Sequence, residues 1–394
     1  MFQHLQVQPP DALLALIKQF HDDPRETKLD LGVGVYRDTD GRTPVFRAVK
    51  EAERVLLSTQ ESKSYLGPEG DLRFVELLQP IVFGAGPYDR IAGIQTPGGT
   101  GALRLAAELA AVGGARRVWV GQPTWPNHAP ILKAAGLEVK PYDYADLTDQ
   151  SLLFEAMLAA LRGAEAGDVV LLHGCCHNPT GIDLDLAQWD AVADVIAARG
   201  LFPLVDFAYQ GLGRGLEEDA AGLRRLLAKV EQALVAYSCD KNFGLYRERT
   251  GAVYAVGRRR DEAELARGNL ANLARVNWSM PPDHGAAAVR IVLDTPDLAQ
   301  DWRRELTGMC ERVNAVREAL AAAEPQLAFL TRQRGLFSNL PVSKDVVARL
   351  RADHAIYMAG SGRVNLAGLQ VRDAEAFVRG LRAAGGLGSA SKAA

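Results

Sequence analysis

Between about residues 90 and 260, short apolar runs alternate with longer stretches of helical pattern. The short runs are apolar at successive positions, which is typical of strands buried on both faces in a parallel sheet that helices cover on each side. The expected strands are RRVWVG (116–121), DVVLLHGCC (168–176), LFPLVDFAYQ (201–210), QALVAYSC (232–239) and GAVYAVG (251–257), and the clearest helices between them are 99–113 and 185–200. We therefore predict an α/β fold with a mostly parallel central sheet.

A long amphipathic helix is expected over residues 297–323. Apolar residues recur there at spacings of three and four and draw a single stripe, which suits a helix that bridges two domains. Beyond it, a few shorter strand and helix patterns predict a smaller α+β domain. The chain has 394 residues, of which 48% are hydrophobic, enough for a large core and two domains.

The charge balance argues against two classes of partner. Charged residues make up 24% of the chain, the formal net charge is -3 and the pI is about 6.2, so neither nucleic acid nor a membrane surface is expected to bind. The N-terminal stretch has only a short apolar run, LLALI, and is predicted to be neither a signal peptide nor a membrane span. Four cysteines in a chain of this length do not indicate a disulfide framework, so a cytoplasmic location is expected.

Polar side chains follow three of the expected strands where each one ends. Asn178 lies in HNPTG, Asp206 and Tyr209 lie in DFAYQG, and Ser238 and Lys241 lie in SCDKNFG. Ligands of open parallel sheets bind beyond the carboxyl ends of the strands. Each residue alone has an ordinary structural explanation, such as turn chemistry or a helix cap, but together they predict a binding crevice.

The stretch TPGGTGALR predicts an anion site at the start of a helix. The glycines from Gly98 to Gly101 let backbone N–H groups approach an anion, which the helix N-terminus also favours. Arg104 replaces the third glycine of a dinucleotide fingerprint, which disfavours a nucleotide-binding dehydrogenase. The phosphate of a small cofactor fits better, and Arg249 is a candidate to neutralise its charge.

The run HGCCH (173–177) resembles a set of metal ligands. On a strand, His173, Cys175 and His177 would share one face. No second cluster accompanies them, so buried, hydrogen-bonded side chains are expected in place of a zinc site, and no metal is predicted.

Motifs along nearly the whole chain resemble those of class I aminotransferases of the aspartate and aromatic amino-acid group, which are pyridoxal-phosphate (PLP) enzymes of fold type I. The matching stretches occur in the order of that family: LGVGVYRDTDGRTP, SYLGPEG, TPGGTGALR, PTWPNH, HGCCHNPTG, DFAYQGLGRGLEEDA, KNFGLYRERTG, PPDHGA and SGRVNLAG. The resemblance implies pyridoxal 5′-phosphate as the cofactor, and amino acids and 2-oxo acids as substrates.

The resemblance also implies roles for the residues at the strand ends. Lys241 would hold the cofactor as a Schiff base and then act as the general base that moves the substrate Cα proton. Asp206 would keep the pyridine nitrogen protonated, so that the ring becomes an electron sink. Tyr209 and Asn178 would hydrogen-bond the phenolic oxygen of the cofactor, and Trp125 would stack on its ring.

Further residues follow by the same motifs. His128 would support Asp206 from behind. The implied phosphate site consists of Gly99, Thr100, Ser238 and Arg249, with Tyr65 from the neighbouring subunit.

Three more residues are implied for the substrate, beside Trp125 and Asn178. Arg363 would grip the α-carboxylate, and Arg275 would reach from the other subunit to the side chain of a dicarboxylate, since a guanidinium binds a carboxylate through two nitrogens. A surface charge on a helix is the alternative for Arg275. Gly34 would lie in a segment that closes over the substrate.

The resemblance implies three parts of the chain and a homodimer with shared sites. Residues 1–12 would form an N-terminal arm on the other subunit, residues 13–45 and 308–394 the small domain, and residues 46–307 the large PLP-binding domain.

Two features depart from the familiar pattern. Asp240 stands before the lysine where a small hydroxyl residue is usual, and strand alternation would point it away from Lys241. It would perturb the lysine or pair with a nearby cation, and both readings stay open. Ser64 and Met280 stand where aspartate-preferring relatives often have asparagine, which favours a site that tolerates aromatic side chains.

These residues predict a PLP-dependent aminotransferase. It would transfer the amino group of tyrosine, phenylalanine or tryptophan, or of aspartate, to 2-oxoglutarate by a ping-pong mechanism. An aspartate-specific aminotransferase is the first alternative. A β-lyase or decarboxylase of the same fold is disfavoured by two carboxylate-binding arginines, and a regulatory PLP-binding module by the lack of a basic helical segment before residue 30.

Overall fold

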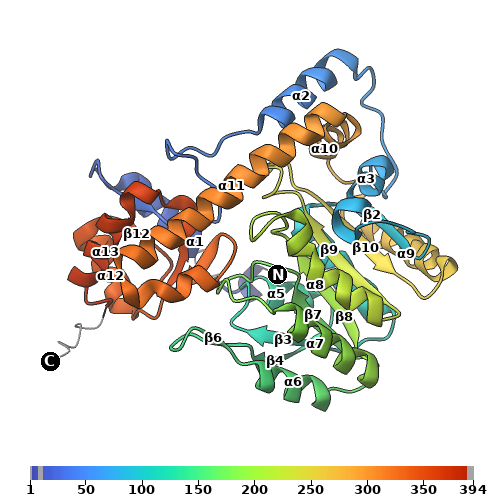
Figure 1. Ribbon diagram of the computed structural model, residues 1–394. Coiled ribbons are helices and arrows are strands. Elements are labelled where there is room, and N and C mark those ends of the chain that lie inside the picture. Colours follow the sequence, from blue (N-terminus) through green and yellow to red (C-terminus); the bar gives the residue numbers. More distant parts are fainter. Residues whose placement is uncertain (1, 8–11, 388–394) are drawn as a thin grey trace.

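A computed structural model of the chain describes residues 2–7 and 12–387. Its centre is a seven-stranded sheet in the order β2-β10-β9-β8-β7-β3-β4 (Figure 1). Strands β9, β8, β7, β3 and β4 run parallel, whereas β10 is antiparallel to both of its neighbours. The strand bounds are β2 Ile91–Pro97, β3 Arg117–Gln122, β4 Glu138–Asp143, β7 Val169–His173, β8 Phe202–Phe207, β9 Ala233–Ser238 and β10 Thr250–Val256.

Alternate residues of each strand face opposite cores, because successive side chains of a strand point to opposite faces. Val170 and Val235 belong to one apolar cluster, whereas their neighbours Leu171 and Leu234 belong to the other. Both clusters are buried. A strand between them must therefore be apolar at every position, as these strands are.

Helices cover both faces of the sheet (Figure 1). On the face of Leu171 lie α4 Gly98–Val112, α5 His128–Ala134 and α9 Arg260–Trp278. On the face of Val170 lie α3 Leu72–Phe83, α6 Phe154–Gly163, α7 Leu186–Arg199, α8 Leu216–Lys229 and α10 His284–Asp294. Helix α2 Arg47–Thr59 packs against α10 and α11. Among the described residues, no helix combines the length and the apolar character needed to cross a lipid bilayer.

Helix α11, Pro296–Ala323, runs from the side of α10 to a second group of elements (Figure 1). Its first half contributes Trp302 and Leu306 to the core beside the sheet, and its second half contributes Val316 and Leu320 to a separate core. The elements around that separate core are α1 Ala12–Asp22, β1 Leu29–Asp30, β11 Phe337–Asn339, α12 Lys344–His354, β12 Ile356–Tyr357, β13 Arg363–Asn365 and α13 Ala374–Ala383, with a 3-10 helix over Pro325–Arg332.

The α/β fold with a mostly parallel sheet is therefore confirmed, and the long helix lies where the apolar stripe predicted it. Two strands are shorter than expected. β8 ends at Phe207 and not at residue 210, and β7 ends at His173, so Cys175 and His177 lie in a turn and not on a strand face. A side chain at Gly174 would come within 2.4 Å of Phe207, and Cys176 has a φ of 53°, so the chain leaves the sheet there. Of the predicted N-terminal arm, residues 1 and 8–11 lie outside the described residues.

Candidate functional site

A cavity of about 320 Å³ opens at the carboxyl ends of β7, β8 and β9. Eleven of the residues singled out in the sequence line it: Gly34, Gly99, Thr100, Trp125, Asn178, Asp206, Tyr209, Asp240, Lys241, Arg249 and Arg363. Val33, Leu103, Ala208 and Phe337 complete the wall. Residues from both ends of the chain thus meet at one edge of the sheet.

Lys241 lies in the turn that follows β9. Its Nζ atom is 5.1 Å from the centre of the Tyr209 ring and makes no hydrogen bond or ion pair with any residue that the structure describes. Burial lowers the pKa of the Lys241 ammonium, although the charges of Asp240 and Asp206 act in the opposite direction. A lysine held without a carboxylate partner against a cavity is poised for covalent or proton-transfer chemistry.

Trp302 of α11 holds the turn that carries Lys241. The Trp302 Nε1 donates to the Asn242 carbonyl at 2.7 Å, and the indole stacks on Phe243 with 4.4 Å between ring centres. Both aromatic residues are fully buried. The lysine is therefore fixed to the long helix as well as to the sheet.

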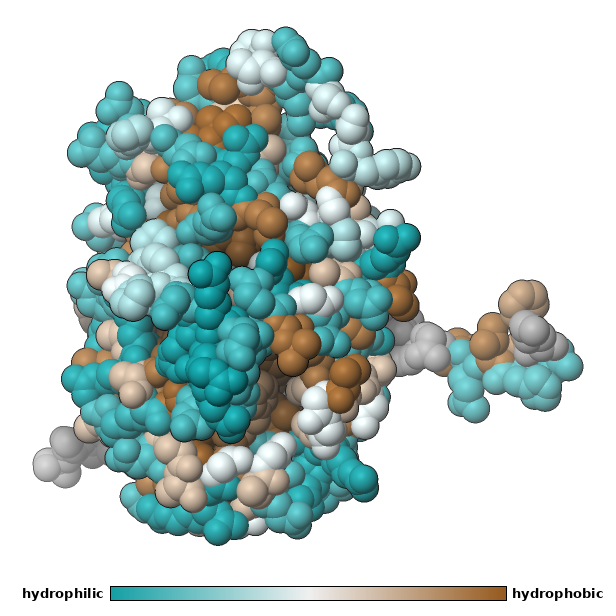
Figure 2. All heavy atoms as spheres, turned by 90° about the vertical axis from the view of Figure 1, so that its right-hand side faces the viewer, coloured by the Kyte–Doolittle hydropathy of each residue, from teal (hydrophilic) through white to brown (hydrophobic). Residues whose placement is uncertain are grey.

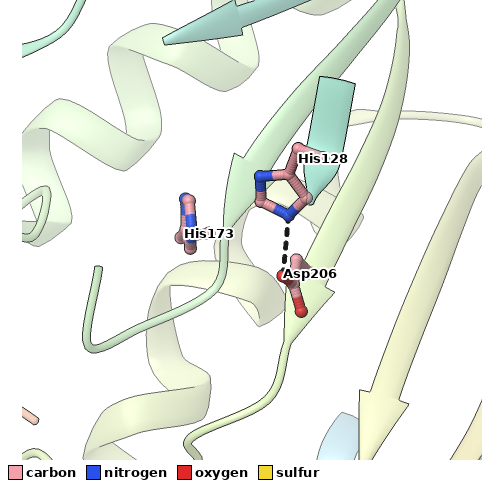
Figure 3. Close-up of side chains that lie close together, drawn as sticks. All are labelled: His128, His173 and Asp206. Atoms are coloured by element: carbon pink, nitrogen blue, oxygen red, sulfur yellow. Dashed lines mark hydrogen bonds and ion pairs between the residues drawn. The ribbon is translucent and has the colours of Figure 1, made fainter. Parts of the chain in front are cut away.

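Asp206 stands at the end of β8, paired in register with His173 of β7. Its Oδ2 atom is 3.0 Å from His128 Nε2 (Figure 3). The other ring nitrogen of His128 is 2.8 Å from Thr124 Oγ1. Burial raises the pKa of the Asp206 carboxyl, but the hydrogen bond and charge of His128 outweigh burial, and the pKa lies below its usual value. Asp206 is thus held as a carboxylate on the cavity wall.

His173 lies beside this pair with its ring 5.2 Å from that of His128 (Figure 3). Its Nε2 atom has no contact with solvent and no hydrogen-bond partner among the described residues. The ligand atoms of His128, His173 and Asp206 are close enough to hold a metal ion, as are those of Cys175, Cys176 and Asp219. In each cluster the carboxylate already has hydrogen-bond partners. Asp206 binds His128. Asp219 accepts from the backbone N–H groups of Gly211, Gly213 and Arg214.

Asn178 and Tyr209 meet on the cavity wall. The Asn178 Nδ2 donates to the Tyr209 hydroxyl at 3.1 Å, while Asn178 Oδ1 is buried with no partner among the described residues. Burial raises the pKa of the Tyr209 phenol, so the hydroxyl keeps its proton. The wall therefore offers a hydroxyl donor and an unused amide oxygen.

A candidate anion site lies where β2 runs directly into α4. Gly98 has a φ of 67°, and a side chain at Gly99 would lie 3.0 Å from the Ser238 Cβ. The absence of these side chains opens the N–H groups of the first turn, which favour an anion. Arg249 lines the cavity beside them, whereas Ser238 lies behind Gly99 and does not line it.

Arg363 enters from β13, on the other side of the cavity. One of its nitrogens donates to the Gly32 carbonyl at 3.0 Å, and its Nε atom is buried without a partner among the described residues. The guanidinium lies 4.7 Å from the centre of the Phe337 ring, and burial lowers its pKa. This unpaired donor suits a carboxylate ligand.

Two of the predicted residues lie away from the cavity. Tyr65 is 94% exposed, and Arg275 is exposed near the end of α9. The resemblance assigns both to the cavity of a neighbouring subunit. Their roles stay predictions, because only a second chain could bring them to a site.

The sequence predicted that the Asp240 side chain points away from Lys241, and this prediction was wrong. Strand alternation holds only as far as Ser238, where β9 ends, and Asp240 and Lys241 then line the same cavity from a turn. Asp240 pairs with Arg249. Phe337 was missed altogether, because GLFSNL carries no signal that distinguishes a cavity wall from ordinary core.

The arrangement fits pyridoxal 5′-phosphate. It combines an unpaired amine, a carboxylate held in its ionised form, an aromatic wall and an anion site, and the orphaned Asn178 Oδ1 and Arg363 Nε atoms call for further partners.

The sequence profile of the family described as aminotransferase class I and II matches residues 26–381. The chain is 55% identical to a tyrosine aminotransferase of Rhizobium meliloti (strain 1021) over 380 residues, which cover 95% of this chain and 97% of the relative. It is 45% identical to an aspartate aminotransferase of Salmonella typhi over 380 residues, with 94% and 96% covered.

Solved structures agree with these relatives. An aromatic amino acid aminotransferase with 3-indolebutyric acid superposes with a TM-score of 0.94 at 44% identity, covering 98% of this chain and all of the other. An aromatic-amino-acid aminotransferase from Burkholderia pseudomallei, covalently bound to pyridoxal phosphate, superposes with a TM-score of 0.94 at 37% identity, with 98% and 99% covered. The chain belongs to the class I and II aminotransferase family. It is an aminotransferase of fold type I, and its cofactor is pyridoxal phosphate.

Proposed function

We propose that this aminotransferase takes the amino group of an aromatic L-amino acid or of aspartate and passes it to 2-oxoglutarate. The observation that carries the proposal is the unpaired Lys241 amine on the same cavity as the unpaired Arg363 guanidinium. Relatives named for tyrosine and for aspartate support this range of donors. The two half-reactions would share one site, which gives ping-pong kinetics.

Lys241 would hold the cofactor and then act as the base. Its lowered pKa raises the fraction of neutral amine near neutral pH, and only the neutral amine can accept the proton from the substrate Cα. When bound, the cofactor supplies an electron-accepting ring that stabilises the charge left on that carbon. The same Nζ atom would then give this proton to the cofactor carbon that carries the amino nitrogen, and would so become a neutral amine again.

Asp206 would keep that ring protonated. The hydrogen bond from His128 fixes the carboxylate, whose lowered pKa keeps it ionised. An ionised carboxylate next to the pyridine nitrogen stabilises the protonated nitrogen. Tyr209 and Asn178 would orient the ring through its phenolic oxygen, and Trp125 would pack on its face.

The phosphate would bind at the start of α4. Backbone N–H groups of Gly99 and Thr100 and the Arg249 guanidinium are the donors that we assign to it. The Ser238 hydroxyl, which the resemblance also implies, accepts from the Asp240 N–H at 3.2 Å and would reach the phosphate only from behind Gly99. Tyr65 would be added by the partner subunit.

Arg363 would bind the α-carboxylate of every donor. The Gly32 carbonyl and the Phe337 ring fix its guanidinium, and its Nε atom is left for the ligand. Gly34 would let the backbone of the 31–36 segment close over the substrate, since a side chain there meets Phe337. These groups position the Cα–H bond toward Lys241.

We propose that the active form is a homodimer. Phe2, Leu5 and Val7 are 81%, 72% and 98% exposed, and the segment that they occupy stands clear of the rest of the molecule (Figure 2). Tyr65 and Val276 are likewise exposed at 94% and 80%. Apolar residues exposed to this degree suit an interface, and a two-fold axis would make the same surface meet itself.

The proposed domain division follows the separation between the two apolar clusters on the sheet and the third cluster around the second half of α11. We propose an N-terminal arm of residues 1–12, a small domain of residues 13–45 and 308–394, and a large cofactor-binding domain of residues 46–307. The core formed by Val316, Leu330, Leu350 and Phe377 is separate from those of the sheet, which supports this division. A cytoplasmic location stays a prediction; the four cysteines are free thiols, as that location requires.

Borohydride reduction of the holoenzyme, followed by peptide mass mapping, tests the site. The reduced adduct is expected on the peptide that contains Lys241. An adduct on another lysine, or none, would overturn the assignment. The kcat/KM values for tyrosine, phenylalanine and aspartate, with 2-oxoglutarate as acceptor, then test the range of donors.

Complementation tests the shared site. Lys241→Ala and Arg275→Ala protomers are each expected to be poor with aspartate, but a hybrid dimer has one site with both residues intact. Random mixing makes half of the dimers hybrid, each with one of two sites restored, so activity should recover to about a quarter of wild type. No recovery in dimers shown to exchange subunits would contradict a site built from two chains.

A further inference from the structure

A carboxylate lies inside the proposed phosphate site. Asp240 is only 3% exposed and lines the same cavity as Thr100, Lys241 and Arg249. Its Oδ2 atom pairs with Arg249 Nη1, and its Oδ1 atom accepts from the Thr250 backbone N–H at 3.1 Å. These contacts fix the carboxylate in place.

The carboxylate also lies against the backbone that would receive the phosphate. A Cβ atom added to Gly98 would be 2.8 Å from Asp240 Oδ2 and 2.7 Å from Arg249 Nη2. Both charged groups therefore flank the first residue of α4. An anion at this helix N-terminus would meet a guanidinium and a carboxylate at once.

The positive charge at this place is already balanced. Arg249 is the cation that lines the anion side of the cavity, and Asp240 pairs with it. Arg104 of the same helix is paired with Glu108. Lys241, which also feels the charge of Asp240, is committed to the cofactor aldehyde in the proposed function.

We infer that Asp240 and the cofactor phosphate compete for Arg249, so that Asp240 lowers the affinity of this enzyme for its cofactor. The inference rests on the proposed function, because it takes the start of α4 as the phosphate site. Two like charges close together in a poorly hydrated site repel strongly, and water screens them little. Asp240 is then a specificity-determining residue for a phosphate ester: it reduces the advantage of pyridoxal phosphate over pyridoxal.

The opposite effect would follow if Asp240 served only to orient Arg249. Arg249 keeps further N–H donors beyond the one that binds Asp240, and a carboxylate that fixes the guanidinium would strengthen phosphate binding. The two roles differ in sign. Competition predicts that loss of the carboxylate charge tightens phosphate binding, whereas orientation predicts that it weakens it.

The experiment measures cofactor affinity in the full-length protein, stripped of cofactor by dialysis against a donor amino acid. Absorbance titrations with pyridoxal phosphate and with pyridoxal give two dissociation constants for wild type, Asp240→Asn and Asp240→Ser. In both variants we expect pyridoxal phosphate to bind at least about tenfold more tightly, because one adjacent like charge is removed. The preference for pyridoxal phosphate over pyridoxal should rise by a similar factor, because pyridoxal has no phosphate and any effect of Asp240 on the Lys241 amine is common to both aldehydes.

Asp183→Asn is the matched control. Asp183 also accepts two backbone hydrogen bonds, from Cys176 and His177, but it does not line the cavity. Its removal should leave the ratio of the two dissociation constants unchanged. An unchanged or lower preference for pyridoxal phosphate in the Asp240 variants that fold, or an equal rise in the control, overturns the inference. If wild type binds neither compound, the proposed function itself fails.

Discussion

The guanidinium of Arg363 lies over the face of Phe337, 4.7 Å from the ring centre. The two residues come from paired strands, β13 and β11, and Phe337 also makes an edge contact with Tyr209 on the far wall. A cation over an aromatic face is attracted to it, more strongly where water is excluded. Phe337 therefore positions the residue that we assign to the substrate carboxylate.

Replacement of Phe337 by leucine should weaken every donor. The lost cation–π contact is worth about 0.5–2 kcal/mol, so KM should rise by roughly two- to thirtyfold for tyrosine and aspartate alike. Steady-state kinetics with both donors measures this. Phe329→Leu, in the core around Val316, should leave KM unchanged. A loss confined to tyrosine would mean that Phe337 contacts the donor side chain and does not act through Arg363.

Gly34→Ala should impair the closing segment. A Cβ atom at this position would lie 2.6 Å from Phe337 Cζ, so the ring or the backbone must move. Such overpacking costs about 1–3 kcal/mol, and we expect kcat/KM to fall by roughly five- to a hundredfold for all donors. Gly360→Ala is the control, because its Cβ would meet nothing within 4 Å. Equal kinetics for the two variants would contradict a role for Gly34 at the site.

Arg275→Ala should separate the two classes of donor. A charge-assisted hydrogen bond to the side-chain carboxylate is worth about 1.5–3 kcal/mol, so kcat/KM for aspartate should fall by at least about tenfold. Phenylalanine has no such carboxylate and should be nearly unaffected. Arg267→Ala, on the same helix and paired with Glu264, controls for a general loss of surface charge. Equal losses for both donors would remove Arg275 from the substrate site.

Acid should destabilise the protein through His173. Burial lowers the pKa of His173 to about 3. Between pH 6.5 and 5, His173 therefore becomes protonated in the unfolded chain but stays neutral in the folded chain. The free energy of unfolding falls by about 2 kcal/mol over this range. Asp219 acts in the opposite direction, because burial raises its pKa to about 6 and the folded state gains the proton first.

Comparison with His173→Gln isolates the histidine. The variant keeps Asp219, so the difference between the two curves of unfolding free energy against pH reports His173 alone. We expect the variant to lose less stability than wild type over this range. Denaturant unfolding at several pH values measures it, and parallel curves would show that His173 is protonated in the folded protein.

The sequence predicted the cavity because parallel strands bring their carboxyl ends to one edge. Asn178, Asp206 and Lys241 each follow an apolar run, and that local signal was enough to group them. Strands β2 and β4 were not anticipated. IAGIQTP contains glycine and ends in proline, and EVKPYD is an edge strand with charged residues and a proline, so neither has a buried-strand pattern.

Contacts between residues that are far apart in the sequence leave no local pattern from which they could be predicted. Phe337 reaches the cavity only because β11 and β13 pair beside it, and the direction of Asp240 depends on the residue at which β9 stops. Tyr65 and Arg275 are a different case. The resemblance assigns them to the cavity of a neighbouring subunit, so the structure of one chain does not test their roles. The family resemblance supplied Tyr65 and Arg275 as predictions, but it did not supply Phe337 or the direction of Asp240.

The placement of two indoles gives this enzyme a built-in optical readout. Trp302 is wholly enclosed and its N–H is committed to a carbonyl, so its emission should stay blue-shifted and beyond the reach of iodide. Trp125 stands on the cavity wall, where a bound chromophore would quench it. With the other three tryptophans, Trp119, Trp189 and Trp278, replaced by phenylalanine, fluorescence should therefore distinguish a change of occupancy from a loosening of the long helix in the same sample.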